Sequence, residues 1–183
     1  MKLVLLPWED RRNHHPLYNT KLPPAPMQPT EYGLDIAQLK DIPHGSVVIV
    51  GGAGILPERF VTDNTVVNCH CGWLPTVRGL DSLKWAIYHG HKIGCTTHVI
   101  DGECDAGKLI ERDAVEVEST DSLFAIAMKQ YELELKMMVD CVLNKRWGFA
   151  QPFSEPRHNP TRRMDHRTEL QMMARLQTKL RVL

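Results

Sequence analysis

The sequence lacks a surplus of charge of either sign. Among its 183 residues, 22 lysines and arginines balance 22 aspartates and glutamates, so the formal net charge is zero. A protein that holds a phosphate backbone or an anionic membrane surface through its overall field needs a basic excess. The composition therefore predicts no nucleic acid and no membrane among its partners.

Long apolar runs and paired cysteines are also missing. The chain opens with Met-Lys-Leu-Val-Leu-Leu, but Pro7 and the charged residues behind it end this run well short of a signal peptide. No other run approaches the roughly 20 apolar residues that cross a bilayer. The five cysteines do not show the spacing of a disulfide framework. These absences predict a soluble, cytoplasmic protein.

The length of the chain allows one sizeable core but not two ordinary domains. We predict a catalytic domain over residues 1–145 and a C-terminal extension with a terminal helix over residues 146–183. Proline residues mark this boundary, because Pro152, Pro156 and Pro160 follow the last long apolar pattern. A second proline-rich segment, residues 16–29, is expected to form a loop.

Hydrophobic periodicity predicts both strands and helices. Strands are expected at residues 1–6, 46–50, 65–69, 95–100 and 114–117, and helices at residues 34–42, 81–89, 120–142 and 165–180. In the longest helix, which Thr120 would cap, one apolar stripe is assigned to the core: Leu123, Phe124, Ala127, Tyr131, Leu135, Met138 and Val142. The last helix is expected to dock on its own chain, with a partner subunit as the alternative.

The most informative segment reads Asn68-Cys69-His70-Cys71-Gly72-Trp73-Leu74-Pro75. Asn68 and His70 are expected at the carboxyl end of a strand, which is the edge where open α/β sheets bind ligands. Strand alternation would point Cys69 and Cys71 away from His70, so one metal ion could not gather all three side chains. We therefore predict no metal site in this segment.

Two other motifs are incomplete. The glycine run at residues 51–54 lacks the register of a phosphate-binding loop, so a turn that ends a strand is the simpler interpretation. Residues 101–105 imitate the start of a calcium loop, but Ala106 and Arg112 stand where that loop needs a glycine and a glutamate. Neither motif predicts a site by itself.

Several short motifs occur in an order that is typical of one family. They are Asn68-x-His70, Leu74-Pro75-x-x-Arg78-Gly79, Gly94-x-Thr96-x-His98 and Asp105-x-Gly107. Over residues 47–142 the chain resembles the folate-dependent formyltransferases, and within them it looks most similar to the sugar N-formyltransferases. The resemblance implies an α/β, Rossmann-like three-layer fold with a mostly parallel sheet and a shortened N-terminal half.

The resemblance implies catalytic roles for Asn68, His70 and Asp105. We hypothesise that Asn68 and a protonated His70 stabilise an oxyanion, while Asp105 raises the pKa of the imidazole and relays a proton. The implied formyl donor is 10-formyltetrahydrofolate as a co-substrate, with no metal. The implied acceptor is a primary amine on a small molecule, such as a nucleotide-linked amino sugar, and a homodimer is possible.

The resemblance also implies the residues that surround this centre. The residues expected to line the folate pocket are Gly54, Ile55, Leu56, Val61, Asp101 and Gly102. His98 is expected behind the catalytic residues, and Trp73 and Arg78 are expected to face the acceptor. Two alternatives stay open: a formyltetrahydrofolate hydrolase, which would use water as the acceptor, and a non-catalytic module that binds folate or a nucleotide-sugar.

Overall fold

The computed structural model describes residues 2–4, 33 and 35–182. The chain divides into two compact units, Met1–Ser46 and Val47–Leu183. In the first unit, β1 (Lys2–Val4) and β2 (Asp35–Ala37) pair in parallel, and the 3-10 helix η3 (Leu39–Asp41) follows them.

The helix predicted for residues 34–42 is therefore wrong. So short a segment gains little helical stability by itself, and pairing with β1 decides the conformation of residues 35–37. The proline-rich loop predicted for residues 16–29 lies outside the described residues.

The second unit is built on a five-stranded sheet in the order β3-β4-β5-β6-β7. The strands are β3 (Val47–Val50), β4 (Thr65–His70), β5 (Gly94–Val99), β6 (Lys108–Ala114) and β7 (Gln151–Pro152). The α/β class is confirmed. The expectation of a mostly parallel sheet is wrong for the described residues, because in this sheet β3 and β4 run parallel while the other three neighbouring pairs are antiparallel.

Four of the predicted strands are confirmed, since β1, β3, β4 and β5 lie in the expected segments. The strand predicted at residues 114–117 is wrong, because β6 ends at Ala114. The charged residues at positions 111–113 interrupt the apolar pattern by which a strand is predicted. The position of β6 is fixed instead by its antiparallel pairing with β5.

The helices of the second unit are α1 (Glu58–Asp63), α2 (Ser82–His89), α3 (Leu123–Leu143), the 3-10 helix η4 (Arg146–Phe149) and α4 (His166–Leu180). The predicted limits of α2 and α4 are confirmed. The side chain that caps α3 is that of Ser122, which accepts the Ala125 N–H at 3.1 Å, and not that of Thr120. Of the helices that the structure describes, none has the length and apolar run that a bilayer crossing requires.

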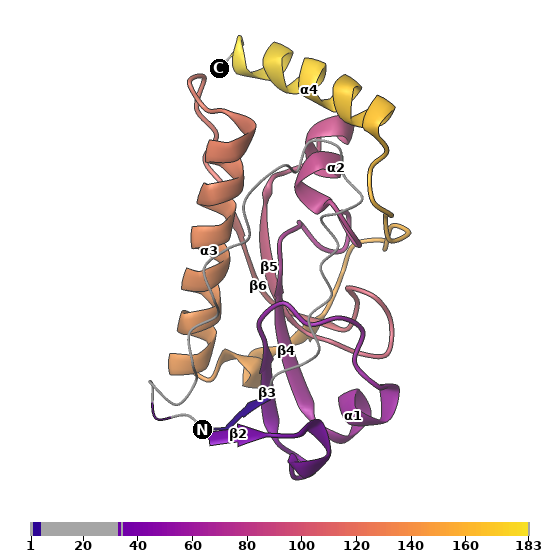
Figure 1. Ribbon diagram of the computed structural model, residues 1–183, viewed down its shortest axis with the longest axis vertical. Coiled ribbons are helices and arrows are strands. Elements are labelled where there is room, and N and C mark those ends of the chain that lie inside the picture. The colour runs from indigo at the N-terminus through magenta and orange to yellow at the C-terminus, as the bar shows by residue number, and fades with distance from the viewer. Residues whose placement is uncertain (1, 5–32, 34, 183) are drawn as a thin grey trace. The chain divides into compact units, whose positions relative to one another are not determined.

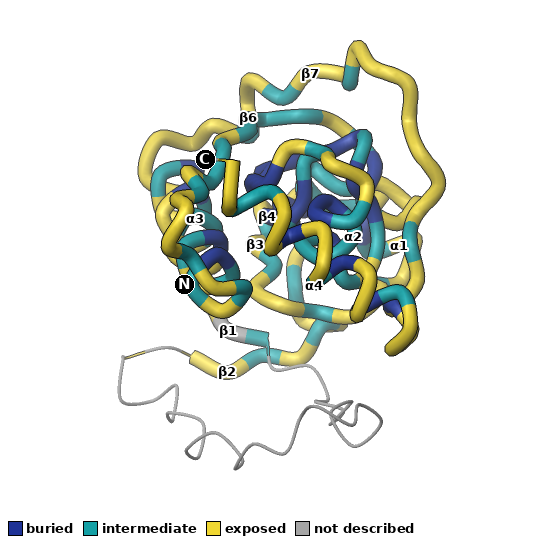
Figure 2. The backbone as a smooth tube through the Cα atoms, turned by 90° about the horizontal axis from the view of Figure 1, so that it is seen from above, coloured by how far each residue is buried: buried dark blue, intermediate teal, exposed yellow. Residues whose placement is uncertain are grey.

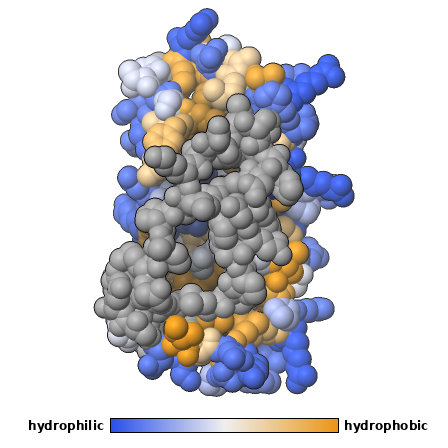
Figure 3. Space-filling model, in the orientation of Figure 1, coloured by the Kyte–Doolittle hydropathy of each residue, from blue (hydrophilic) through white to orange (hydrophobic). Residues whose placement is uncertain are grey.

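The main core lies between α2, α4 and the start of α3. Helix α3 runs along one face of the sheet, and α2 packs against α4 (Figures 1 and 2). The fully buried residues of this core are Val77, Ala86, Ile87, Ile93, Ile126, Met164, Met172 and Leu176. The last helix therefore docks on its own chain, as predicted. Leu170 of α4 is nevertheless 58% exposed, and Figure 3 shows hydrophobic residues at the surface of the end of the second unit that α2 and α4 form.

Helix α3 turns a different stripe inward from the one that periodicity predicts. Its buried residues are Ile126, Gln130, Met137 and Cys141. Much of the predicted core stripe is exposed instead: Phe124 by 74%, Tyr131 by 52%, Leu135 by 49% and Val142 by 41%. The core assignment is wrong for these four residues, because periodicity does not say which side of an apolar helix meets the sheet. Leu123 and Met138 of the predicted stripe do pack against buried core residues.

Candidate active site

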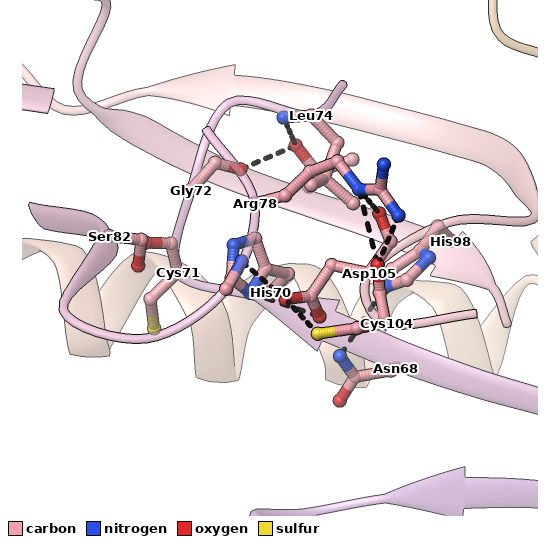
Figure 4. Close-up of polar contacts among 12 residues, drawn as sticks. Asn68, His70, Cys71, Gly72, Leu74, Arg78, Ser82, His98, Cys104 and Asp105 are labelled. Carbon is pink, nitrogen blue, oxygen red and sulfur yellow. Dashed lines mark hydrogen bonds and ion pairs between the residues drawn. The ribbon is translucent and has the colours of Figure 1, made fainter. Parts of the chain in front are cut away.

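Strand β4 brings Asn68 and His70 to one face of the sheet, next to residues from β5 and from the loop that follows it (Figure 4). In the ladder between β4 and β5, Asn68 lies opposite His98. The Asn68 Nδ2 and His98 Nε2 atoms are 3.3 Å apart. The amide of Asn68 is therefore in direct contact with the imidazole of His98.

His98 is fully buried and holds the amide of Asn68 in place. Its Nδ1 lies 2.7 Å from the carbonyl oxygen of Ala106 and must donate to it, which leaves Nε2 as an acceptor for Asn68. Burial lowers the pKa of His98 to about 4. His98 is thus a neutral imidazole that orients Asn68, which agrees with the expected place of His98 behind the catalytic residues.

Both ring nitrogens of His70 have partners. Nε2 donates to the Val77 carbonyl at 3.0 Å, and Nδ1 lies 3.4 Å from Oδ1 of Asp105. Burial lowers the pKa of His70, and the opposing charge of Asp105 does not overcome this effect. The resting imidazole is therefore neutral near pH 7, with its proton on Nε2 and its Nδ1 facing Asp105. The role of a protonated His70 in stabilising an oxyanion stays a prediction.

Gly72 has no side chain, and the ring of His70 occupies the space where a side chain would lie. A Cβ atom at this position would lie 2.6 Å from Nε2 of His70 and 2.6 Å from the Val77 carbonyl oxygen. Such a contact would force the ring or the backbone to move. A glycine at position 72 is therefore required for the hydrogen bond between His70 and Val77.

The loop after β5 presents Asp105 to His70. Asp105 has a φ of 44°, in the left-handed region, and its Oδ2 accepts the Gly79 N–H at 2.7 Å. The structure corrects the expectation that Arg78 faces the acceptor. Arg78 is only 6% exposed, and its guanidinium donates to the carbonyl oxygens of Cys104, Asp105 and His158, so it holds this loop.

The two segments predicted to form the folate pocket lie next to each other. A Cβ atom on Gly102 would be 3.5 Å from the Glu58 side chain, at the start of α1. The exposed residues of these segments are Gly54, Ile55, Asp101 and Gly102, while Leu56 is half-buried and Val61 is buried. Ile55 is 97% exposed, so a large apolar side chain is available to a ligand at this edge.

Two cations lie close to the indole ring of Trp73. Lys92 Nζ is 4.0 Å from the centre of this ring, and the Arg112 guanidinium carbon is 5.1 Å from that centre. Arg112 also donates to the Leu74 carbonyl at 2.9 Å. The structure thus gives Trp73 a cationic setting beside the site, and its orientation toward an acceptor stays a prediction.

The thiols of Cys69 and Cys71 lie on the other face of β4. Cys69 is buried with Cys95 and Met137, and the Cys71 thiol donates to Glu134 of α3 at 2.8 Å. Both side chains point away from His70, as strand alternation predicts. Within the described ranges, no group of three or more His, Cys, Asp or Glu side chains is placed to hold a metal ion.

Sequence reasoning missed the backbone groups that complete the site. The Val77 carbonyl and the Gly79 N–H bind His70 and Asp105, but main-chain groups carry no residue-type signal. The backbone at position 79 does leave a signal in the sequence. Its φ of 90° favours glycine, and Gly79 stands there.

Comparison with known proteins identifies relatives of this arrangement. The sequence profile of the family described as formyl transferase matches residues 34–142. The chain is 25% identical over 120 residues to the methionyl-tRNA formyltransferase of Thermodesulfovibrio yellowstonii, a match that covers 64% of this chain and 39% of that protein. It is 36% identical over 78 residues to the mitochondrial formyltetrahydrofolate deformylase 2 of Arabidopsis thaliana, with coverage of 42% and 24%.

A solved structure shares the fold. The formyltransferase PseJ from Anoxybacillus kamchatkensis was crystallised with UDP-4,6-dideoxy-4-formamido-L-AltNAc and tetrahydrofolate. It matches with a TM-score of 0.55 and 19% identity, over 72% of this chain and 75% of that one. The chain spans about two fifths of the length of the methionyl-tRNA formyltransferase, 39% of it.

Proposed function

Because the chain belongs to the formyl transferase family, we propose that it transfers a formyl group from 10-formyltetrahydrofolate to a primary amine on a small-molecule acceptor. The observation that carries this proposal is the convergence of Asn68, His70 and Asp105 on one edge of the sheet, with each side chain fixed by a separate partner. Fixed polar groups of this kind are suited to a charge that develops during a reaction.

Asn68 is proposed to stabilise the charge that develops on the formyl oxygen. Its amide nitrogen has two hydrogens, and His98 accepts one of them. The second hydrogen is available to the substrate. A single donor aimed at a developing oxyanion typically lowers the barrier by about 3 to 4 kcal/mol.

His70 and Asp105 are proposed to handle the proton. The amine nitrogen bonds to the formyl carbon, the bond from that carbon to folate N10 breaks, and one amine proton passes to N10. The His70 Nε2–H is engaged by Val77, so a proton on its way can be held between Nδ1 and Asp105, 3.4 Å apart. A neutral resting imidazole can take up this proton directly, which suits the lowered pKa of His70.

The segments around Ile55 and Gly102 are proposed to hold the donor. The exposed aliphatic side chain of Ile55 can pack against a ring. The exposed carboxylate of Asp101 already accepts the Glu103 N–H at 2.9 Å and has lone pairs left for donors on the pterin. These groups supply the mixed apolar and polar wall typical of cofactor pockets.

A nucleotide-linked amino sugar is the acceptor class that we propose. The fold is shared with PseJ, which was crystallised with a UDP-linked formamido sugar and tetrahydrofolate. Trp73 would be available to a sugar and Lys92 to a phosphate next to the site, while Arg112 is already paired with Glu155 at 2.7 Å.

The test is an assay of formyl transfer by the variants His70→Ala and Asp105→Asn, with a panel of nucleotide-linked amino sugars. Each substitution should lower kcat/KM by about 100-fold or more, because each removes a proton-transfer group. Asp113→Asn is the matched control, since this exposed carboxylate binds only the adjacent Ala114 N–H among the contacts found for it.

Thermal unfolding of each variant separates loss of activity from loss of folding. If His70→Ala and Asp105→Asn both stay folded and active, the proposed roles are wrong. The similarity to a deformylase gives a second candidate function. Release of formate without a formylated amine would favour that hydrolase.

A further inference from the structure

Residues 158–164, here called the strap, run beside the loop that presents Asp105. The strap lies beyond residues 34–142, which the family profile matches. Gly79 and Thr161 pair in an isolated parallel bridge. The strap therefore meets the site at the residues that bind Asp105.

Thr161 fixes the backbone on both sides of Gly79. Its N–H donates to the Arg78 carbonyl at 2.8 Å, and its hydroxyl oxygen lies 2.8 Å from the carbonyl oxygens of both Arg78 and Leu80. The Leu80 N–H donates back to the Thr161 carbonyl at 3.0 Å. A Cβ atom on Gly79 would lie 2.3 Å from that carbonyl oxygen, so the two segments touch.

Arg78 and Gly79, which Thr161 binds, also bind the loop that carries Asp105. The Gly79 N–H donates to Oδ2 of Asp105 at 2.7 Å. Arg78 binds the Cys104 carbonyl through Nε at 3.1 Å and Nη2 at 2.6 Å, and it reaches the His158 carbonyl of the strap through Nη1 at 3.0 Å. The strap and the Asp105 loop are thus tied to each other through Arg78 and Gly79.

We infer that Thr161 is a positioning residue, whose hydroxyl fixes the direction of the Gly79 N–H and thereby the distance between Asp105 and His70. Its catalytic consequence rests on the proposed function. The backbone of Asp105 is in the left-handed conformation, which is less favourable for a residue with a side chain than for glycine. Local backbone preference alone therefore does not keep Asp105 in this position. An external tie through Gly79 supplies the constraint.

The strap has anchors that do not depend on this hydroxyl. Met164 is 4% exposed, and its N–H donates to Oδ2 of Asp81 at 3.0 Å. The indole N–H of Trp85 donates to the Arg162 carbonyl at 2.8 Å. Removal of the Thr161 hydroxyl should therefore leave the strap docked and change only the fine placement of Gly79.

The experiment compares Thr161→Val, which keeps the shape and removes the hydroxyl, with Thr161→Ser, which keeps the hydroxyl. For Thr161→Val we expect kcat to fall by about tenfold, with little change in KM for the donor, since small misplacements of catalytic groups lower the rate strongly. Thr161→Ser should stay near the wild type. Thr178→Val is the matched control, because its hydroxyl donates only along α4, to the Ala174 carbonyl at 3.1 Å.

A second readout does not require activity. The charged groups that act on His70 are Asp105 and Glu134, which raise its pKa, and Arg78, which lowers it. If Asp105 moves away in Thr161→Val, the pKa of His70 should fall below its wild-type value in an NMR titration of the ring. Thr161→Ser and Thr178→Val should leave it unchanged.

The two readouts distinguish the two proposals. A wild-type chain that transfers no formyl group would overturn the proposed function, while the titration would still decide the role of Thr161. Unchanged kcat together with an unchanged His70 titration in folded Thr161→Val would overturn the positioning role. An equal loss in Thr161→Ser would do the same, because the hydroxyl would then not be the cause.

Discussion

At the scale of single residues, His98 couples folding to pH. Burial lowers the pKa of its imidazole from 6.5 to about 4, so the unfolded chain binds this proton more readily than the folded chain. The stability that His98 contributes is fully present above pH 6.5 and is lost as the pH falls toward 4. Over this pH range the free energy of unfolding falls by about 3 kcal/mol because of His98.

The measurement is the free energy of unfolding from chemical denaturation across this pH range. The wild type should lose about 3 kcal/mol more stability on acidification than His98→Gln, whose side chain does not titrate. His89→Gln, which replaces an exposed histidine at the end of α2, should follow the wild type. Parallel curves for wild type and His98→Gln would contradict a buried neutral His98.

At the scale of secondary-structure elements, the two stripes of α3 should differ in what they contribute to stability. Ile126 is fully buried in the core, whereas Leu135 on the other stripe is 49% exposed. Ile126→Ala should lower the free energy of unfolding by about 2 to 5 kcal/mol, because it leaves a cavity. Leu135→Ala should cost about 0.5 kcal/mol or less, as surface substitutions do.

Both variants remove aliphatic atoms from the same helix, so urea denaturation of the pair controls for helix propensity. A similar loss for both would show that the outer stripe is covered in solution. That result would restore the core assignment that periodicity alone suggests.

Elements with local signals were predictable from the sequence. Helix α2 ends at Gly90, which adopts the left-handed conformation, and α4 begins where the Asp165 side chain accepts the Thr168 N–H. Strands β3 and β4 are short apolar runs, which periodicity detects. Strand β6 was missed because its pairing with β5, and not its own pattern, fixes its place.

The candidate site was predictable only in part, because contacts between distant segments fix much of its geometry. Asn68, His70 and Asp105 belong to recognisable motifs, and the structure brings them together. The lowered pKa of His70 could not be predicted, because burial depends on the whole fold and not on neighbours in the sequence. The inward orientation of Arg78 depends on the strap, a contact that no local pattern reveals.

At the scale of the whole molecule, the predicted boundary between residues 145 and 146 separates parts that share a core. Met164, Met172 and Leu176 from the proposed extension pack with Ala86 and Ile87 of α2. Deletion of residues 146–183 should therefore expose apolar surface of the core and abolish cooperative unfolding. Burial of each such side chain stabilises the fold by about 1.5 to 3 kcal/mol.

Calorimetry and gel filtration of a chain truncated after residue 145 would check this expectation. A shorter deletion that removes only the last residues after α4, from Arg181 on, is the control, because Arg181 and Val182 are exposed. If the chain of residues 1–145 unfolded cooperatively, the predicted boundary would mark an independent domain.

The contact between Thr161 and Arg78 spans 83 positions of the chain, and this separation sets an order of assembly. Pairings between distant segments form late, because the intervening chain must first be ordered. On a ribosome, β4 emerges with Asn68 and His70 long before the strap does. A nascent chain would thus carry the chemical groups of the site before they are aligned, and activity would follow only once the strap has been synthesised and has paired with Gly79.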